Sequence, residues 1–288
     1  MAYTAQDLLH LLDLEPIEVN IYRGQNRDIG TGRVFGGQVL AQGLVAARRT
    51  VEEDRDAHSV HGYFILPGDL EIPIVYFVER LRDGKSFSTR RVTAIQHGRA
   101  IFNMSASFQV REVGPDHQAP MPTAPPPETV APELDLIRGI AERIPESLRP
   151  VLTQDRPLDF RVVDPVDPFH PASHPPFRRL WVRAIGAMPE ETLANQAVLA
   201  YASDYGLLAT ALLPHALSIR QRGVQVATLD HAIWFHRPFH MDDFMLIAMD
   251  SPAAHGARGF SRASVFTRDG RLVASLAQEG LVRVTTQK

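Results

Sequence analysis

Apolar residues recur with helical spacing in two stretches of the chain. In the first stretch, residues 37–52, apolar side chains gather on one face of a helix. The second stretch, residues 193–213, is apolar enough to resemble a membrane span. Asp204 lies inside it, and a carboxylate at the centre of a bilayer is costly. We therefore predict one long buried helix in each half of a folded domain, and no membrane span.

Runs of alternating apolar and polar residues follow each predicted helix and predict antiparallel strands. They lie at residues 58–66, 71–81, 87–96 and 99–110 in the first half, and at 226–235, 244–249, 259–267 and 271–284 in the second. HGRAIF at 97–102 and DGRLVA at 269–274 occupy corresponding places, each as a hairpin turn between long strands. The chain is thus a repeat of one helix followed by an antiparallel meander.

Proline separates the two repeats. Of 22 prolines, 15 lie between Glu112 and Pro176, and proline favours extended or irregular backbone. We predict an N-terminal domain at 1–112, a proline-rich linker at 113–155 and a C-terminal domain at 156–288. A short helix is expected inside the linker, near residues 133–143. The fold class is α+β, with the two sheets joined edge to edge, since this pairing removes an exposed strand edge from each.

Composition excludes several classes of function. A net charge of -3 does not favour a nucleic-acid partner, and the lack of cysteine excludes disulfides, cysteine-bound metals and a cysteine nucleophile. The G-x-S-x-G and P-loop motifs are absent. His170 and His174 stand among prolines, so we predict no metal there. The N-terminus has no basic residues before its first apolar ones, so we expect no signal peptide and a cytoplasmic protein.

Two polar residues stand out in apolar surroundings. Asp204 is the only acidic or basic residue between Glu191 and Arg220, counting histidine as neutral, and a buried carboxylate is unfavourable unless it is paired. Gln278 is the only residue with a polar side chain on its face of the last predicted strand. A helix cap for Asp204 and a core amide for Gln278 stay open as structural explanations. Thr228 is ordinary by itself, because threonine is common in strands.

Longer motifs resemble one known family. They are RVFGGQVLAQGLVAA (33–47), HSVHGYFILPGD (58–69), LRDGKSFSTRRVTAIQHGRAIFNMSASFQ (81–109), YASDYGLL (201–208), ATLDHAIWFHRPF (227–239) and ARGFSRASVFTRDGRLVASLAQEG (257–280). In this order they resemble the acyl-CoA thioesterase II (TesB-type) family over nearly the whole chain. The resemblance implies a double hot-dog fold, in which two antiparallel sheets each wrap a long helix and join as a pseudo-dimer.

The resemblance also implies a reaction. It predicts hydrolysis of acyl-CoA thioesters to free fatty acid and CoA, with no cofactor and no metal. The family's catalytic Asp, Thr and Gln match Asp204, Thr228 and Gln278, which we expect to activate a water molecule. His58 and His61, in HSVHGYF, are predicted accessory residues. By analogy with hot-dog proteins we expect a homodimer or homotetramer.

Two alternatives concern the activity itself. An acyl-CoA hydratase or dehydratase would need a His–acid pair at the helix, and no histidine lies in 193–214. A non-catalytic acyl-CoA binding protein would not need a buried Asp–Thr–Gln set.

The first helix has no carboxylate between Gln38 and Val51, so we expect one working site per chain. The CoA phosphates would prefer a basic rim, and Arg90, Arg91, Arg258 and Arg262 are candidate members of that rim.

Overall fold

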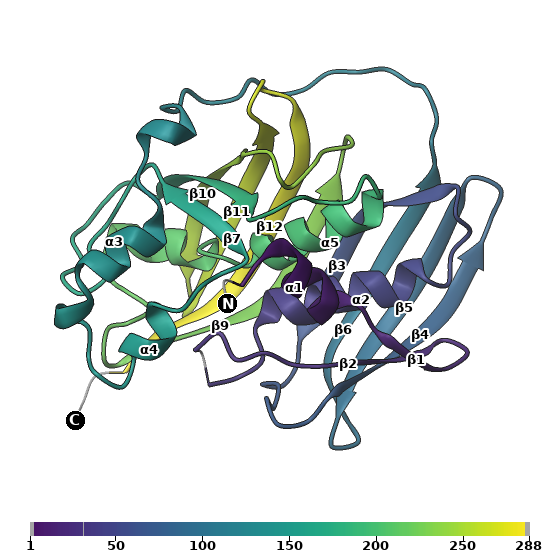
Figure 1. Ribbon diagram of the computed structural model, residues 1–288, viewed down its shortest axis with the longest axis horizontal. Helices are drawn as coiled ribbons and strands as arrows, with labels where there is room; N and C mark the ends of the chain where they lie inside the picture. The colour runs from purple at the N-terminus through teal and green to yellow at the C-terminus, as the bar shows by residue number, and fades with distance from the viewer. Residues whose placement is uncertain (1–2, 31, 286–288) are drawn as a thin grey trace.

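The computed structural model describes residues 3–30 and 32–285 (Figure 1). Each half has the same order of two short strands, one long helix and four longer strands. The first half contains α1 (Ala5–Leu12), β1 (Glu15–Glu18), β2 (Ile21–Gly24), α2 (Gly36–Arg48), β3 (Arg55–Phe64), β4 (Ile74–Asp83), β5 (Phe87–Gln96) and β6 (Arg99–Val110). The second half contains β7 (Leu158–Val162), β8 (Phe177–Ala184), α5 (Thr192–Ser203), the 3-10 helix η3 (Leu208–His215), β9 (Val224–Phe235), β10 (Met245–His255), β11 (Arg258–Thr267) and β12 (Leu272–Val284).

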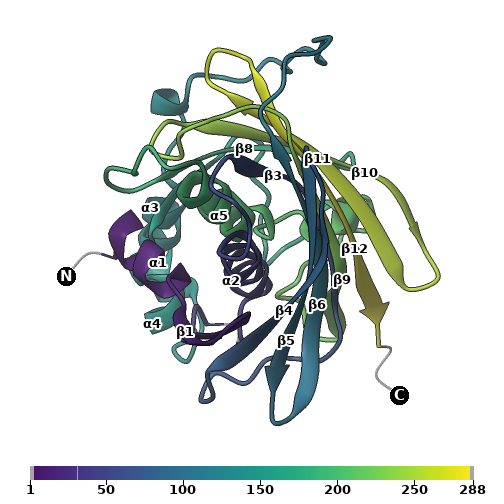
Figure 2. The same cartoon turned by 90° about the vertical axis from the view of Figure 1, so that its right-hand side faces the viewer.

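All twelve strands form one antiparallel sheet. Their order is β1-β2-β4-β5-β6-β3-β9-β12-β11-β10-β8-β7, so the second half repeats the first in mirror order. The halves meet where β3 pairs with β9, with Ser59 opposite Trp234 and Tyr63 opposite Asp230. The sheet curves around α2 and α5 (Figure 2). This confirms the predicted pair of curved sheets, each on a long helix and joined edge to edge.

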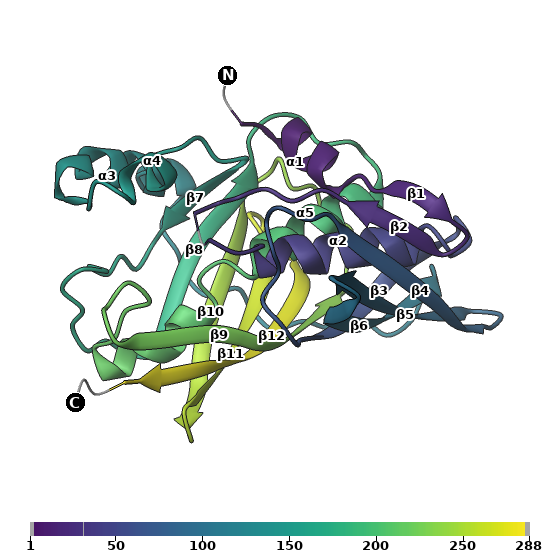
Figure 3. The same ribbon diagram turned by 90° about the horizontal axis from the view of Figure 1, so that it is seen from below.

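The two central helices are buried on all sides. Every residue from Gly37 to Ala47 in α2 is buried, as is every residue from Ala194 to Ser203 in α5. Helices whose residues are mostly apolar or small all round belong in a core. Figure 3 shows α2 and α5 between α1 and the sheet. They approach so closely that a Cβ on Gly37 would lie 2.3 Å from the backbone oxygen of Tyr201.

Several predicted elements differ from the structure. Strands β5 and β6 have the predicted bounds, but β10 continues to His255, and the short strands β1, β2, β7 and β8 were not predicted. The predicted helix 193–213 is wrong in its second part, because α5 ends at Ser203 and the chain turns before η3. Gly206 adopts a φ of 77° in that turn, a conformation that ends a helix.

The same region is the one stretch of the described residues with the length and hydropathy of a membrane span. It covers Thr192–His215, and 67% of its most apolar window is buried inside the fold. Burial against other parts of the chain explains the apolar composition.

The proline-rich connection is not a bare linker. It contains η1 (Pro127–Thr129), α3 (Glu133–Gly139), η2 (Ala141–Arg143) and α4 (Arg149–Leu152), with the predicted short helix at α3 and η2. Glu133 accepts a hydrogen bond from the hydroxyl of Tyr205 and one of 2.8 Å from Arg156. This connection therefore packs on the residue that follows Asp204. The domain boundaries at 112/113 and 155/156 stay a prediction.

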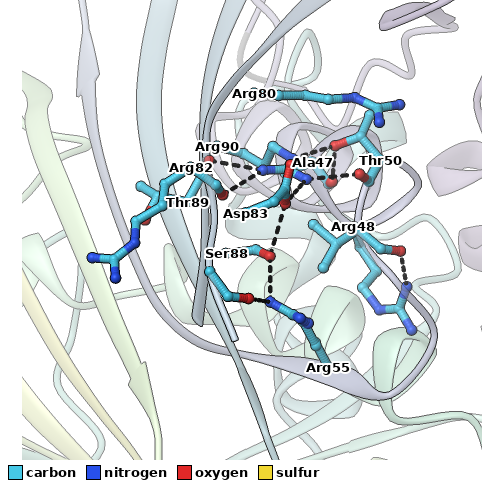
Figure 4. A network of polar contacts seen from close by, with 12 residues as sticks. Ala47, Arg48, Thr50, Arg55, Arg80, Arg82, Asp83, Ser88, Thr89 and Arg90 are labelled. Carbon is cyan, nitrogen blue, oxygen red and sulfur yellow. Dashed lines mark hydrogen bonds and ion pairs between the residues drawn. The ribbon is translucent and has the colours of Figure 1, made fainter. Parts of the chain in front are cut away.

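Arg90 on β5 is buried, and its hydrogen bonds link the sheet to the end of α2 (Figure 4). Its Nε donates to Thr50 Oγ1 at 2.8 Å, and its Nη2 donates to the Thr50 carbonyl at 2.9 Å and to Asp83 Oδ1 at 2.6 Å. Nη1 donates to the carbonyls of Arg82 and Thr89, each at 3.0 Å. The guanidinium is thus fully used inside the fold, and the prediction that Arg90 belongs to a basic rim is wrong.

Replacing Arg90 with methionine is expected to lower the free energy of unfolding by about 2 kcal/mol, because the carbonyl and hydroxyl of Thr50 lose a charged donor and stay buried. Urea unfolding at equilibrium measures the change. The matched control is Arg91→Met, at an arginine 52% exposed and 3.7 Å from Glu79. We expect that control to fall within about 0.5 kcal/mol of the wild type. Equal effects at both positions would contradict the role given to Arg90.

Candidate active site

The side chains of Asp204, Thr228 and Gln278 meet in the second half. Gln278 Nε2 on β12 donates to Asp204 Oδ1 at 2.6 Å and to Thr228 Oγ1 at 3.1 Å. The hydroxyl of Thr228 on β9 donates to the same Asp204 oxygen at 3.3 Å. Asp204 is the C-cap residue of α5, so the carboxylate stands where the helix ends over the sheet. The helix-cap and functional explanations for Asp204 are thus compatible.

A β-bulge brings Thr228 to the site. On β12, Gln278 pairs with His231 and Gly280 pairs with Thr228, so β9 has one extra residue, Leu229, between the two pairs. Residues that lie directly opposite in a sheet share a face, and Gln278 is on the buried face toward the helices. Strict alternation from His231 would have turned Thr228 outward. The bulge turns it inward, which is a common use of bulges beside functional sites.

The carboxylate of Asp204 is a stronger base than an ordinary aspartate. Burial raises the pKa of Asp204 to about 6, against the opposing effect of the hydrogen bonds from Gln278, Thr228 and the Gly37 N–H. The dominant cause is that an apolar setting disfavours the charged form. The carboxylate is therefore still the main form at neutral pH, but it accepts a proton readily.

The first half supplies one donor to this site. The backbone N–H of Gly37, in the first turn of α2, donates to Asp204 Oδ2 at 3.0 Å. A carboxylate at a helix N-terminus is favoured by the helix dipole and by the free N–H groups there. Gly36 also lies close to this carboxylate, because a Cβ built on Gly36 would be 2.6 Å from Asp204 Oδ2. The two halves thus build the surroundings of Asp204 together.

The structure does not bring His58 and His61 to this cluster. His58 Nε2 lies 2.8 Å from Ser107 Oγ on β6, and the His61 ring packs edge-on against Trp234. His61 follows the buried Val60 along β3 and so points to the opposite face. His58 lies at a β-bulge between Ala57 and Ser59, and its contact with Ser107 places it on the same outer face, turned away from α2 and α5. An accessory role for them in this site has no structural support.

Two further arginines of the predicted basic rim are engaged in ion pairs. Arg258 pairs with Glu279 at 2.9 Å, and Arg262 pairs with Asp250 at 3.0 Å. Over residues 3–30 and 32–285, no three His, Asp or Glu side chains gather as a metal-binding group.

Sequence reasoning missed His231. This residue is 1% exposed, and its Nε2 lies 2.9 Å from the Oγ of Ser203, the residue before Asp204. Burial lowers its pKa to about 3, so the ring is neutral at physiological pH. The sequence carried a signal, because His231 alternates with Ile233 and Phe235 along the strand and so had to share their buried face.

Comparison with known proteins agrees with this architecture. A family model described as acyl-CoA thioesterase matches residues 153–281, and one described as acyl-CoA thioesterase N-terminal domain matches residues 25–109. The chain is 42% identical to acyl-CoA thioesterase 2 of Haemophilus influenzae over 283 residues, covering 98% of this chain and 99% of that one.

Solved structures show the same likeness. The acyl-CoA thioesterase II TesB2 of Mycobacterium marinum superposes with a TM-score of 0.78 at 40% identity, covering 96% of this chain and 98% of the other. A hot-dog protein of unknown function from Alicyclobacillus acidocaldarius superposes with a TM-score of 0.77 at 18% identity, covering 96% and 97%, and shows the fold alone. With relatives of this identity along its whole length, the chain belongs to the acyl-CoA thioesterase II family of double hot-dog thioester hydrolases.

Proposed function

We propose that this thioesterase hydrolyses acyl-CoA to free fatty acid and CoA by direct attack of a water molecule held by Asp204, Thr228 and Gln278. The observation that supports it best is the buried carboxylate of Asp204, with a pKa of about 6, inside hydrogen-bonding distance of two neutral polar side chains. Water that is fixed beside such a base is a better nucleophile than water in solution.

The step balances with no further reactant. The water oxygen bonds to the thioester carbonyl carbon while Asp204 takes one of its protons. The tetrahedral intermediate then collapses, the C–S bond breaks, and CoA leaves as a thiolate that recovers a proton. A thiol has a pKa of about 8.5, so departure of the CoA thiolate needs little help from an acid. This explains why a weak carboxylate base suits a thioester better than an amide.

Gln278 is suited to orient the water. Its Nε2 donates hydrogen bonds to Asp204 and Thr228. Its Oε1 is buried and has no hydrogen-bond partner within the described part of the chain. An amide oxygen accepts two hydrogen bonds. A water that donates one proton to Asp204 and the other to Gln278 Oε1 directs its lone pair away from both, toward a substrate carbonyl.

Other aspects of the function are further proposals. We propose that acyl chains of rather broad length occupy apolar space between helix and sheet, as the family resemblance suggests. A cytoplasmic location and a homodimer or homotetramer stay predictions for this chain.

Direct water attack has a sharp test. The enzyme is mixed with an acyl-CoA under steady-state turnover, free CoA is measured with a thiol reagent, and samples are quenched in acid for intact-protein and peptide mass spectrometry. We expect CoA release with an unmodified enzyme mass. An acyl group on the peptide that contains Asp204 would overturn direct attack, and the absence of CoA release over all chain lengths would overturn the activity.

Thr228 offers a conservative test of the water site. Thr228→Val keeps the shape of the side chain and removes its hydroxyl, so the hydrogen bond to the Asp204 carboxylate is lost. We expect kcat to fall by about 20-fold, as for loss of a hydrogen bond to a charged group. Thr228→Ser restores the hydroxyl and should stay within about threefold of the wild type. Equal activity in the valine and serine variants would remove Thr228 from the mechanism.

A further inference from the structure

His231 lies where the three elements of the site come together. It is three residues after Thr228 on β9 and directly opposite Gln278 on β12. Its Nε2 is 2.9 Å from the Oγ of Ser203, the last residue of α5 and the neighbour of Asp204 in the chain. One imidazole thus joins the end of the helix to the strand pair that carries the other two site residues.

The hydrogen bonds decide which nitrogen of this ring carries the proton. Ser203 Oγ also donates to the backbone oxygen of Ala200 at 2.8 Å, which uses its single hydroxyl proton. His231 Nε2 must then be the donor to Ser203 Oγ, and Nδ1 is a bare acceptor. Nδ1 has no partner among the described residues. The other tautomer would leave a buried N–H without a partner, and such groups are rare in folded proteins.

The bond to Ser203 bears on the position of the base. Asp204 has a φ of −80° and a ψ of −3° as the C-cap, and the helix does not continue beyond it. The last turn of a helix frays when nothing holds it. The hydrogen bonds to the Asp204 carboxylate weaken whenever it takes up a proton during turnover, because a neutral carboxyl is a weaker acceptor than a carboxylate. A neutral bond one residue earlier holds the turn in place in both states.

We propose that His231 is a positioning residue for the thioesterase reaction: its neutral Nε2–H, bonded to Ser203, holds the end of α5 so that the Asp204 carboxylate faces Thr228 and Gln278. This inference rests on the proposed role of Asp204 as the base. This role needs no proton transfer, because the Nε2 proton stays in the hydrogen bond to Ser203 Oγ.

Two substitutions of His231 separate this role from simple core packing. The amide nitrogen of glutamine occupies about the position of histidine Nε2, whereas that of asparagine reaches only about as far as Nδ1. We expect His231→Gln to keep kcat within about threefold of the wild type. We expect His231→Asn to lower kcat by about 10-fold with KM unchanged, because only the distance between base and water is disturbed.

Ser203→Ala removes the other partner of the same bond. It is expected to lower kcat by about 10-fold as well, and the double variant Ser203→Ala/His231→Asn should lose no more than either single variant, since the bond can be broken only once. Where His231→Asn does not fold, Ser203→Ala carries the test. The matched control is His236→Asn, because His236 makes the same kind of contact, 2.9 Å from Ser275 Oγ, in an exposed position. We expect it to have wild-type kcat.

The outcomes distinguish this inference from the proposed function. An equal loss of kcat in His231→Gln and His231→Asn would overturn the positioning role. So would an unchanged kcat in both His231→Asn and Ser203→Ala. Full activity in Asp204→Asn would instead overturn the base itself. Inactive Asp204→Asn together with fully active His231→Asn would leave the proposed function intact and reject only His231.

Discussion

Replacing Asp204 with asparagine is expected to lower kcat by about 10³-fold. A positioned general base contributes roughly 10²- to 10⁴-fold, and the asparagine amide also presents a donor where Gly37 and Gln278 already donate. The measurement is the rate of CoA release under saturating acyl-CoA. The matched control is Asp230→Asn, which removes a carboxylate from the outer face of β9, the strand that carries Thr228. This control should leave kcat within about twofold of the wild type.

The pH dependence of the wild type gives a second measure of the same group. Only the carboxylate form of Asp204 can accept a proton, and burial raises its pKa to about 6. We therefore expect kcat/KM to be level above about pH 7 and to fall about tenfold per pH unit below about pH 6. The residual rate of Asp204→Asn should lack this acid limb. A wild-type limb near pH 4, or an identical limb in the variant, would assign the base to another group.

Gly36→Ala is expected to lower kcat by about 10²-fold while the protein stays folded. The added Cβ would lie 2.6 Å from Asp204 Oδ2 and 3.1 Å from two ring carbons of Phe64, so the carboxylate must move. A shift of about 1 Å in a catalytic group costs about that factor. The expected loss appears in kcat, measured by CoA release, with a thermal melting temperature close to that of the wild type.

Gly43→Ala is the control for helix propensity, because it lies on the same helix. Its Cβ would lie 3.0 Å from the sulfur of the flexible Met104 side chain and 3.7 Å from Phe102 Cε1, an ordinary van der Waals distance. We expect nearly full activity in this variant. Equal activity losses at Gly36 and Gly43 would mean that α2 as a whole is disturbed, and the close contact of Gly36 with the base would then not explain the effect.

The structure also gives a physical reason to expect one site per chain. Counted from the matching turns that start at His97 and Asp269, Ala106 on β6 stands where Gln278 stands on β12. The end of α2 is filled by the Arg90 guanidinium, which donates to the Thr50 carbonyl. A cation suits a helix C-terminus through the helix dipole, and it leaves no base at this position.

The elements that the sequence predicted well are those set by local periodicity. Strands β5 and β6 alternate regularly and are joined by His97 and Gly98, both with positive φ, so their bounds followed from the pattern alone. The end of α5 could not be predicted this way, since the residues beyond it are as apolar as the helix. The structure ends the helix at Ser203 because the next residues turn to reach the sheet.

For the site, residue pattern alone singled out Asp204 and Gln278, because an isolated polar side chain in an apolar face is visible along one element. Thr228 depended on family resemblance, since its direction is reversed by a bulge that exists only when β9 pairs with β12. The sequence did not show that His58 and His61 lie away from the site or that Arg90 is buried. The reason is related: alternation shows that a strand has two faces, but long-range pairing decides which face meets a helix. The chain itself therefore determined the repeated helix-and-meander fold and the residue types of the site. The tertiary structure alone decided that these residues converge and that the pKa of Asp204 is raised, because burial arises only after folding. It also brought the Gly37 N–H to Asp204 and His231 to Ser203, because these contacts join distant segments of the chain.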